Sequence, residues 1–147
     1  MPIESIGSVL KKKGHQICSV APDATVHDAI AIMAAKNVAA VLVISEGELI
    51  GIISARDYGR KVALEGKSSR DVRVQEIMTT SLVTITPEIT VLEAMELMTR
   101  HHIRHLPVLQ EGRLDGLISM GDLVSEVISG QAFTIDQLHT YISGAQH

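Results

Sequence analysis

Two aspartates, Asp57 and Asp122, each lie three positions after a serine that closes a short apolar run. An ionised carboxylate only accepts hydrogen bonds and has two oxygens, so one aspartate can bind both hydroxyls of a ribose. In the first turn of a helix the ionised form is favoured, and backbone N–H groups remain free for a phosphate. The pattern therefore indicates two candidate sites for a ribose and its phosphate.

A structural role competes with this interpretation. Ser54 with Asp57, and Ser119 with Asp122, also fit the capping box, in which a serine and an acidic residue three positions later bond each other's backbone N–H groups. Threonines begin three similar patterns elsewhere in the chain. A carboxylate that caps its own helix cannot also bind a ribose well, so the pattern taken alone favours the cap.

An internal repeat places the two serine–aspartate turns in equivalent positions. The segment from Ile17 to Val62 aligns without a gap with the segment from Leu82 to Val127, at a shift of 65 residues. Two copies are too few for a solenoid, so a pseudo-twofold pair is expected. Identical pairs include Pro22 and Pro87, Met33 and Met98, Gly51 and Gly116, Ser54 and Ser119, and Asp57 and Asp122.

Each copy predicts the order strand, helix, strand, strand, helix. A short strand precedes a proline, a capping box begins the first helix, and two apolar runs flank a Glu-Gly turn. The apolar runs are continuous, which indicates sheets covered on both faces. The predicted strands are 17–20, 41–44 and 49–53 in the first copy and 82–85, 106–109 and 114–118 in the second; the closing helices are 56–64 and 121–128.

The boundaries of the copies follow from the linker and the chain ends. The sequence predicts an N-terminal helix over 1–15, a first repeat over 16–66, a second repeat over 67–130 and a C-terminal helix over 131–147. The lysines of residues 11–13, followed by Gly14, could steer anions, but they fit better as the solvated end of the first helix. The fold class is α/β (α+β), with two repeats in one compact module.

Composition excludes several classes of protein. The chain has 147 residues, 46% of them hydrophobic, and a net charge of −4, which indicates a folded domain and argues against a general nucleic-acid binder. No apolar run approaches the roughly 18 residues of a membrane helix. Cys18 is the only cysteine, so no intrachain disulfide can form and a cytoplasmic location is expected.

The repeat resembles the cystathionine-β-synthase (CBS) domain pair, or Bateman module. The resemblance covers about residues 9–127 and rests on Gly-x-Ile-Ser-x-x-Asp closing both copies and on Arg104-His105-Leu106-Pro107-Val108. The chain is most similar to small stand-alone bacterial CBS-pair proteins. The resemblance implies a regulatory sensor whose clefts hold an adenine nucleotide, such as AMP, ADP, ATP, NAD(H) or S-adenosylmethionine, and a homodimer that signals to an effector protein.

In the family, each cleft is lined by the Ser-x-x-Asp turn of one copy and the first hairpin strand of the other. The first cleft also carries cations that suit phosphates, whereas Gly121 stands where the first turn has Arg56, which weakens the case for anion binding at the second. Carried over, the first cleft comprises Ser54, Arg56, Asp57, Thr80, Ile103, Arg104 and His105, and the second comprises Val38, Ala39, Ala40, Ser119, Met120 and Asp122.

Other functions are weighed against the sensor. His101, His102 and His105 suggest a metal site, but no carboxylate or cysteine accompanies them at a useful spacing, so no metal is expected. No phosphate-binding loop, nucleophile elbow or zinc motif indicates an enzyme. The remaining alternative is a purely structural dimerisation module with empty clefts. For either function, the apolar residues of the helices predict a homodimer, namely Val26, Ile30, Met33, Val91, Met95 and Met98, with Ile135, Leu138 and Ile142 of the tail.

Overall fold

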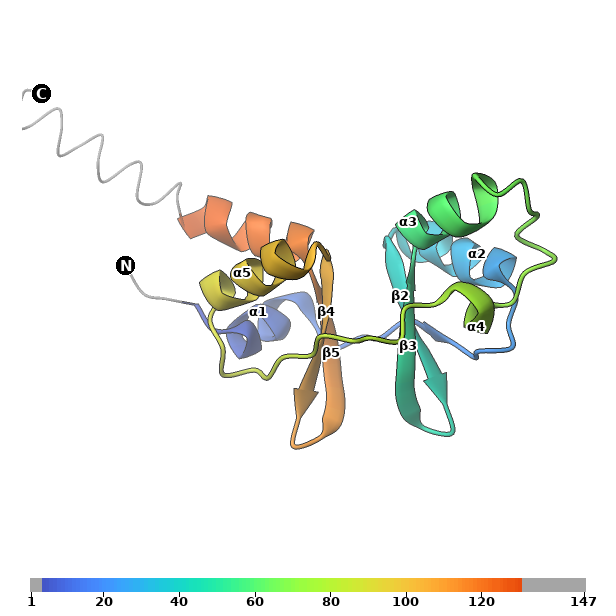
Figure 1. Ribbon diagram of the computed structural model, residues 1–147. Coiled ribbons are helices and arrows are strands. Elements are labelled where there is room, and N and C mark those ends of the chain that lie inside the picture. Colours follow the sequence, from blue (N-terminus) through green and yellow to red (C-terminus); the bar gives the residue numbers. More distant parts are fainter. Residues whose placement is uncertain (1–3, 131–147) are drawn as a thin grey trace, which may run out of the picture. The chain divides into compact units, whose positions relative to one another are not determined.

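The computed structural model describes residues 4–130 (Figure 1). The chain forms two compact units. The first-repeat unit is Gln16–Val83, and the second-repeat unit combines the N-terminal residues up to His15 with the chain from Thr84 onward. The predicted C-terminal helix over 131–147, with Ile135, Leu138 and Ile142, lies outside the described residues. The mixed α+β class is confirmed.

The first-repeat unit holds a three-stranded sheet in the order β1-β2-β3. Strand β1 pairs with β2 in parallel, and β2 pairs with β3 as an antiparallel hairpin. Helices on one side of the hairpin bury their apolar residues against Val41, Val43 and Ile53 (Figure 1). The elements are β1 (Ser19–Val20), α2 (Val26–Lys36), β2 (Ala40–Ser45), β3 (Glu48–Ser54), α3 (Ala55–Tyr58), the π-helix η1 (Gly59–Ala63) and α4 (Val74–Ile77).

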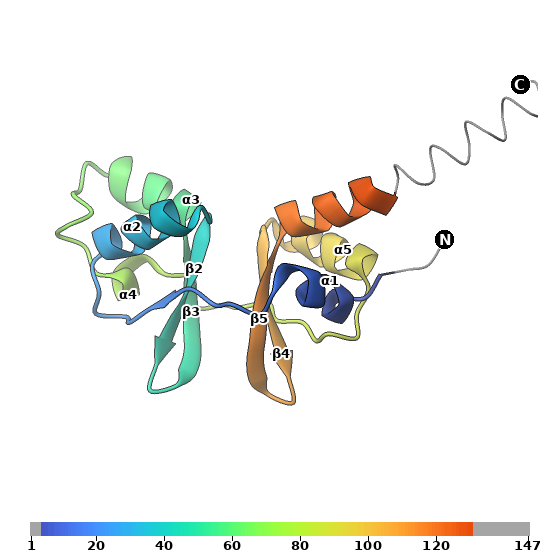
Figure 2. The same ribbon diagram turned by 180° about the vertical axis from the view of Figure 1, so that it is seen from behind.

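The second-repeat unit repeats this plan around the hairpin of β4 and β5. Figure 2 shows α1 beside α5 in this unit, although α1 begins the chain and α5 follows residue 90. The elements are α1 (Ile6–Lys13), α5 (Val91–His101), β4 (His105–Gln110) and β5 (Arg113–Ser119), and residues 120–130 are helical.

The tight turns of the hairpins explain their Glu-Gly pairs. Glu46 and Gly47 have φ angles of 52° and 79°, and Glu111 and Gly112 have 53° and 76°. Two consecutive residues with positive φ match the twist of a two-residue hairpin, and glycine takes this conformation without a steric cost. Both hairpins predicted from the sequence are therefore confirmed.

The strand predicted over 82–85 is reduced to a single bridge between Ile85 and Val108. In the first repeat, the N–H of Leu42 donates to the carbonyl of Cys18 at 3.0 Å, which extends the pairing of β1. The equivalent of Leu42 is Pro107, which has no N–H to donate. The loss of that one donor accounts for the shorter pairing.

Helices α1 and α4 occupy equivalent places in the two units. The N–H of Ile6 donates to Ile89 at 2.8 Å, and the N–H of Val74 donates to Ala24, the equivalent of Ile89, also at 2.8 Å. Helix α1 thus packs on the second repeat, and α4 packs on the first. Residues 67–83, which the sequence analysis assigns to the second repeat, pack on the first, and α1 packs on the second.

The apolar helix residues that motivate the dimer prediction are largely used within their own units. Val26 is 0% exposed, Met33 and Val91 are 5% exposed, and Met98 is 1% exposed. For these four residues, the assumption that a single pair leaves them uncovered is therefore wrong, whereas Ile30 and Met95 are partly exposed. The short helices α1 and α4, which the sequence places at the N-terminus and in the second repeat, complete the cores of the second-repeat unit and the first-repeat unit, respectively.

Candidate functional site

The first serine–aspartate turn joins β3 to α3. Ser54 is the N-cap of α3, and its Oγ accepts a hydrogen bond from the N–H of Asp57 at 3.1 Å. Oδ2 of Asp57 accepts in return from the N–H and the hydroxyl of Ser54, at 2.9 and 3.0 Å. The turn thus carries a complete capping box.

The second turn has the same geometry. The N–H of Asp122 donates to Oγ of Ser119 at 3.1 Å, and the N–H of Ser119 donates to Oδ2 of Asp122 at 2.8 Å. Repeat symmetry predicted from the sequence therefore extends to individual hydrogen bonds.

The capping bonds use only one oxygen of each carboxylate. They end on Oδ2 in both turns, while Oδ1 of Asp57 faces the Lys61 ammonium at 3.1 Å and Oδ1 of Asp122 takes no part in the box. The sequence analysis treats capping and ligand binding as competing roles. The geometry separates them, since each aspartate can cap its helix through one oxygen and keep the other as an acceptor.

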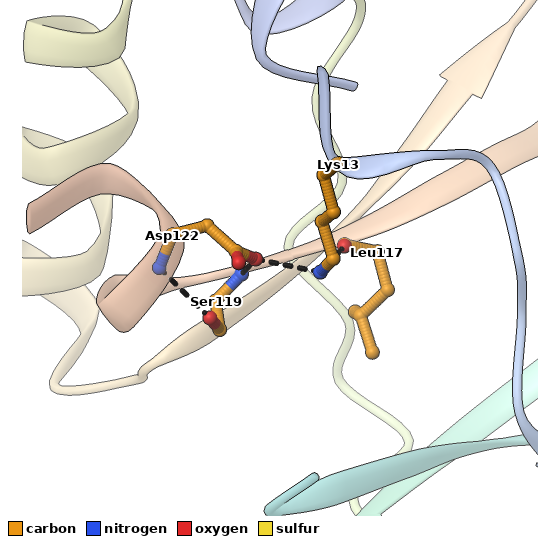
Figure 3. Close-up of polar contacts among 4 residues, drawn as sticks. All are labelled: Lys13, Leu117, Ser119 and Asp122. Carbon is orange, nitrogen blue, oxygen red and sulfur yellow. Dashed lines mark hydrogen bonds and ion pairs between the residues drawn. The ribbon is translucent and has the colours of Figure 1, made fainter. Parts of the chain in front are cut away.

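A lysine lies next to each aspartate, but the two lysines come from different elements. In the first unit, Nζ of Lys61 lies one helical turn beyond Asp57 and also donates to the carbonyl of Ile77 at 2.8 Å. In the second unit, Nζ of Lys13 at the end of α1 donates to Oδ2 of Asp122 and to the carbonyl of Leu117, both at 2.6 Å (Figure 3).

Sequence reasoning missed Lys13. It treats the lysines of residues 11–13 as a solvated helix end, and the helix end itself is confirmed, with Gly14 as the C-cap. Lys12 and Lys13, however, form ion pairs with Glu126 and Asp122, each at 2.6 Å. One signal was available, because the shift of 65 places Glu126 opposite Lys61, so the second repeat lacks a lysine of its own there.

The first hairpin strand of each copy lies beside the serine–aspartate turn of the same copy. In the first unit, Ala40 pairs with Ser54, and the N–H of Ala55 donates to the carbonyl of Ala39 at 2.9 Å. The preceding Val38 is 40% exposed. These three small residues, predicted for the second cleft, are thus neighbours of the first turn within their own unit.

The second unit shows the equivalent arrangement. His105 pairs with Ser119, and the N–H of Met120 donates to the carbonyl of Arg104 at 2.8 Å. Ile103 precedes them and donates its N–H to the carbonyl of Met98 at 3.0 Å. The start of β4, with Arg104 and His105, is therefore adjacent to the Asp122 turn. The clefts that combine residues of both repeats stay a prediction.

Arg56 and Thr80 are both exposed in the first-repeat unit. Thr80 follows Thr79, whose backbone exchanges hydrogen bonds of 2.9 and 3.0 Å with Ile52 of β3. Both residues are thus accessible to solvent, as a role in ligand binding requires.

Charges around Asp122 set the protonation states of the second turn. Burial lowers the pKa of the half-buried His105, and the positive charges of Lys13 and Arg104 act in the same direction, against the attraction of Asp122. Burial alone would raise the pKa of Asp122, but the hydrogen bonds from Lys13 and Ser119 and the Lys13 charge outweigh it and lower that pKa. Near neutral pH the turn therefore presents an ionised carboxylate beside a neutral imidazole and two cations.

The three histidines considered as metal ligands occupy different structural positions. His101 ends α5, His102 is its C-cap with φ of 54°, and His105 begins β4. Within residues 4–130, no group of three or more histidine, cysteine or acidic side chains could hold a metal ion. Over the same residues, every helix falls short of the length and apolar character that a membrane span requires.

The two units thus share one plan, a helical layer on a hairpin that ends in an equivalent aspartate turn. The family model of the CBS domain matches residues 9–62 and 74–129, so the chain belongs to the CBS domain family, as the resemblance implies. CBS-pair proteins are regulatory modules.

Relatives and solved structures agree with this assignment. The mitochondrial CBS domain-containing protein CBSX3 of Arabidopsis thaliana is 40% identical over 95% of this chain and 72% of its own length. A solved protein with CBS domains from Burkholderia ambifaria MC40-6 is 45% identical, with a TM-score of 0.83 over 86% of this chain and 96% of that chain. The CBS domain pair of protein MJ0100, solved with 5-methylthioadenosine and S-adenosyl-L-methionine, shares the fold at 23% identity, with a TM-score of 0.75 over 88% of this chain and 99% of that chain.

Proposed function

We propose that this protein is a sensor that binds an adenine nucleotide, AMP or NAD(H), and passes the state of occupancy to a partner protein. The observation that carries the proposal is the pair of equivalent turns. Each presents an aspartate whose Oδ2 accepts the capping bond from its serine N–H, at 2.9 Å in the first turn and 2.8 Å in the second, with a lysine ammonium beside it. A ribose supplies two hydroxyl donors for a carboxylate, and a phosphate is attracted to the ammonium.

The fold supports the adenosyl class of ligand. The MJ0100 pair holds two adenosyl compounds, which shows what a pair of this fold can accommodate. In this chain, a nearby lysine at both turns favours a ligand that carries negative charge. For this reason we favour a nucleotide over an uncharged adenosine derivative. The cytoplasmic location also stays a proposal, since the Arabidopsis relative is mitochondrial.

A nucleotide panel tests this function directly. AMP, NAD⁺, NADH, ATP and S-adenosylmethionine are added to the purified protein, and thermal unfolding is followed. A ligand at 100 times its dissociation constant should stabilise the fold by about 2.7 kcal/mol. No shift with any member of the panel would contradict the sensor and favour the alternative, a purely structural dimerisation module.

We also propose a homodimer, whose contact uses other apolar residues than those that predict it in the sequence. Leu92 of α5 is 58% exposed, and Val124 and Ile128 in the helix over 120–130 are 39% and 58% exposed. The last two are four residues apart and share one helix face. The second-repeat unit thus leaves apolar surface on its helices that a self-complementary contact would cover.

Light scattering at micromolar concentration checks the assembly. A homodimer should have about twice the chain mass of 15.9 kDa. Leu92→Glu together with Ile128→Glu should reduce it to the chain mass, whereas Leu64→Glu, at a residue 82% exposed in the first-repeat unit, should leave the dimer intact. A wild-type protein with the chain mass would contradict the dimer.

A further inference from the structure

The second repeat lacks both cations of the first turn. At the shift of 65 residues, Gly121 replaces Arg56 and Glu126 replaces Lys61. Helix α1 supplies substitutes from outside the repeated segment, because Lys12 pairs with Glu126 and Lys13 pairs with Asp122, each at 2.6 Å. In the first unit the lysine near the aspartate, Lys61, belongs to the repeat itself. In the second unit the corresponding lysine, Lys13, belongs to the N-terminal helix α1.

The ammonium of Lys13 is placed to bind a further acceptor. It has three donor hydrogens, and Oδ2 of Asp122 and the carbonyl of Leu117 account for two of them (Figure 3). The Lys13 side chain is 34% exposed, more than the 24% of Asp122. The Lys13 side chain therefore stays partly exposed to solvent while its ammonium contacts the carboxylate.

The surrounding charges leave a positive surplus. Arg104 lies at the strand start that bonds Met120, next to the turn, and His105 senses the charges of both Lys13 and Arg104. With His105 neutral, the Lys13 ammonium balances the Asp122 carboxylate, and Arg104 adds a further positive charge near His105. A ribose adds no charge to these groups, whereas a phosphate adds a negative charge that balances the remaining positive one.

From this arrangement we propose that Lys13 is a specificity-determining residue of the second site, where it binds the phosphate of the ligand whose ribose Asp122 holds. The inference rests on the proposed nucleotide function. The 5′-phosphate is attached to the same sugar as the two ring hydroxyls, and the flexible four-carbon stem of the lysine lets the ammonium turn from the carboxylate toward the phosphate. Lys13 then distinguishes AMP from adenosine, and α1 is part of the ligand site.

The test isolates the second site and compares two ligands. In an Asp57→Ala background, AMP and adenosine are titrated by calorimetry into Lys13→Gln, Lys13→Arg and the matched control Lys12→Gln. Lys13→Gln should weaken AMP about tenfold or more, the loss expected for a charged hydrogen bond, and leave adenosine unchanged. Lys13→Arg should keep most of the AMP affinity, and Lys12→Gln should keep the ratio of the two affinities.

Each contrary result has a distinct meaning. Equal losses for AMP and adenosine would show that Lys13 acts only through the packing of α1, and unchanged AMP affinity would remove Lys13 from the site. If the wild type binds AMP and the Asp57→Ala background does not, the second site is refuted while the proposed function stands at the first. If the wild type binds neither ligand, the proposed function itself fails.

Discussion

Replacing Leu10 by alanine should lower the free energy of unfolding of the second-repeat unit by about 2–5 kcal/mol, the range for a large-to-small change in a packed core. Leu10 is 0% exposed at the end of α1. It packs so closely on β5 that a Cβ placed on Gly116 would lie 2.7 Å from its Cδ2. The side chain thus fills the space that the absent Gly116 side chain provides.

Chemical denaturation measures the loss, and amide hydrogen exchange assigns it to a unit. Leu64→Ala is the matched control, because it makes the same change at a residue that is 82% exposed, so its removal should cost far less. A Leu10→Ala protein as stable as the Leu64→Ala control would show that α1 is not docked as described.

Replacing Asp57 and Asp122 together by alanine should weaken AMP binding by about 1.5–3 kcal/mol per occupied site, or roughly 10- to 150-fold, because the ribose hydroxyls lose a charged acceptor. Calorimetry of the two single variants separates the sites, since Asp57→Ala leaves the second site intact and Asp122→Ala leaves the first. Asp122→Ala should show the smaller net loss, because it also frees Lys13 to turn fully toward the phosphate.

Two controls separate ligand contact from helix capping. Asp28 forms the same capping box with Thr25 at the start of α2, and neither residue belongs to the proposed sites, so Asp28→Ala removes a cap and leaves the site residues unchanged. Asp57→Asn keeps a capping oxygen but loses the charge. If Asp28→Ala reduces AMP affinity as much as Asp57→Ala does, the turns serve only to cap their helices.

Local signals in the sequence were sufficient for the elements. Local signals include the two Glu-Gly turns and the capping boxes that begin with Thr25, Ser54 and Thr90, because each depends on residues within a few positions of one another. The repeat is recognised from the sequence compared with itself at a shift of 65 residues. Each local signal reflects hydrogen bonds or dihedral angles of the local backbone, so it can be recognised without knowledge of the tertiary fold. The aspartate turns were predicted for the same reason.

The surroundings of the second turn could not be predicted in this way. Lys13 and Asp122 are 109 residues apart in sequence, and Lys12 and Glu126 are 114 apart. A run of lysines before a glycine looks the same whether it is solvated or paired with a distant helix. Periodicity likewise places Val26 and Met98 on apolar helix faces, but it does not show whether the same unit or a second subunit covers them.

The discontinuous second-repeat unit has a consequence for the order of synthesis on the ribosome. Helix α1 is made first, yet its contacts at Leu117 and Asp122 are made more than 100 residues later. An isolated helix of eight residues is marginal in water, so the nascent helix should stay unfolded while the continuous first-repeat unit folds. Only a chain elongated past Asp122 can give α1 its binding surface, so α1 would dock as one of the last steps of biogenesis. Premature termination would then leave this apolar segment exposed to chaperones and proteases.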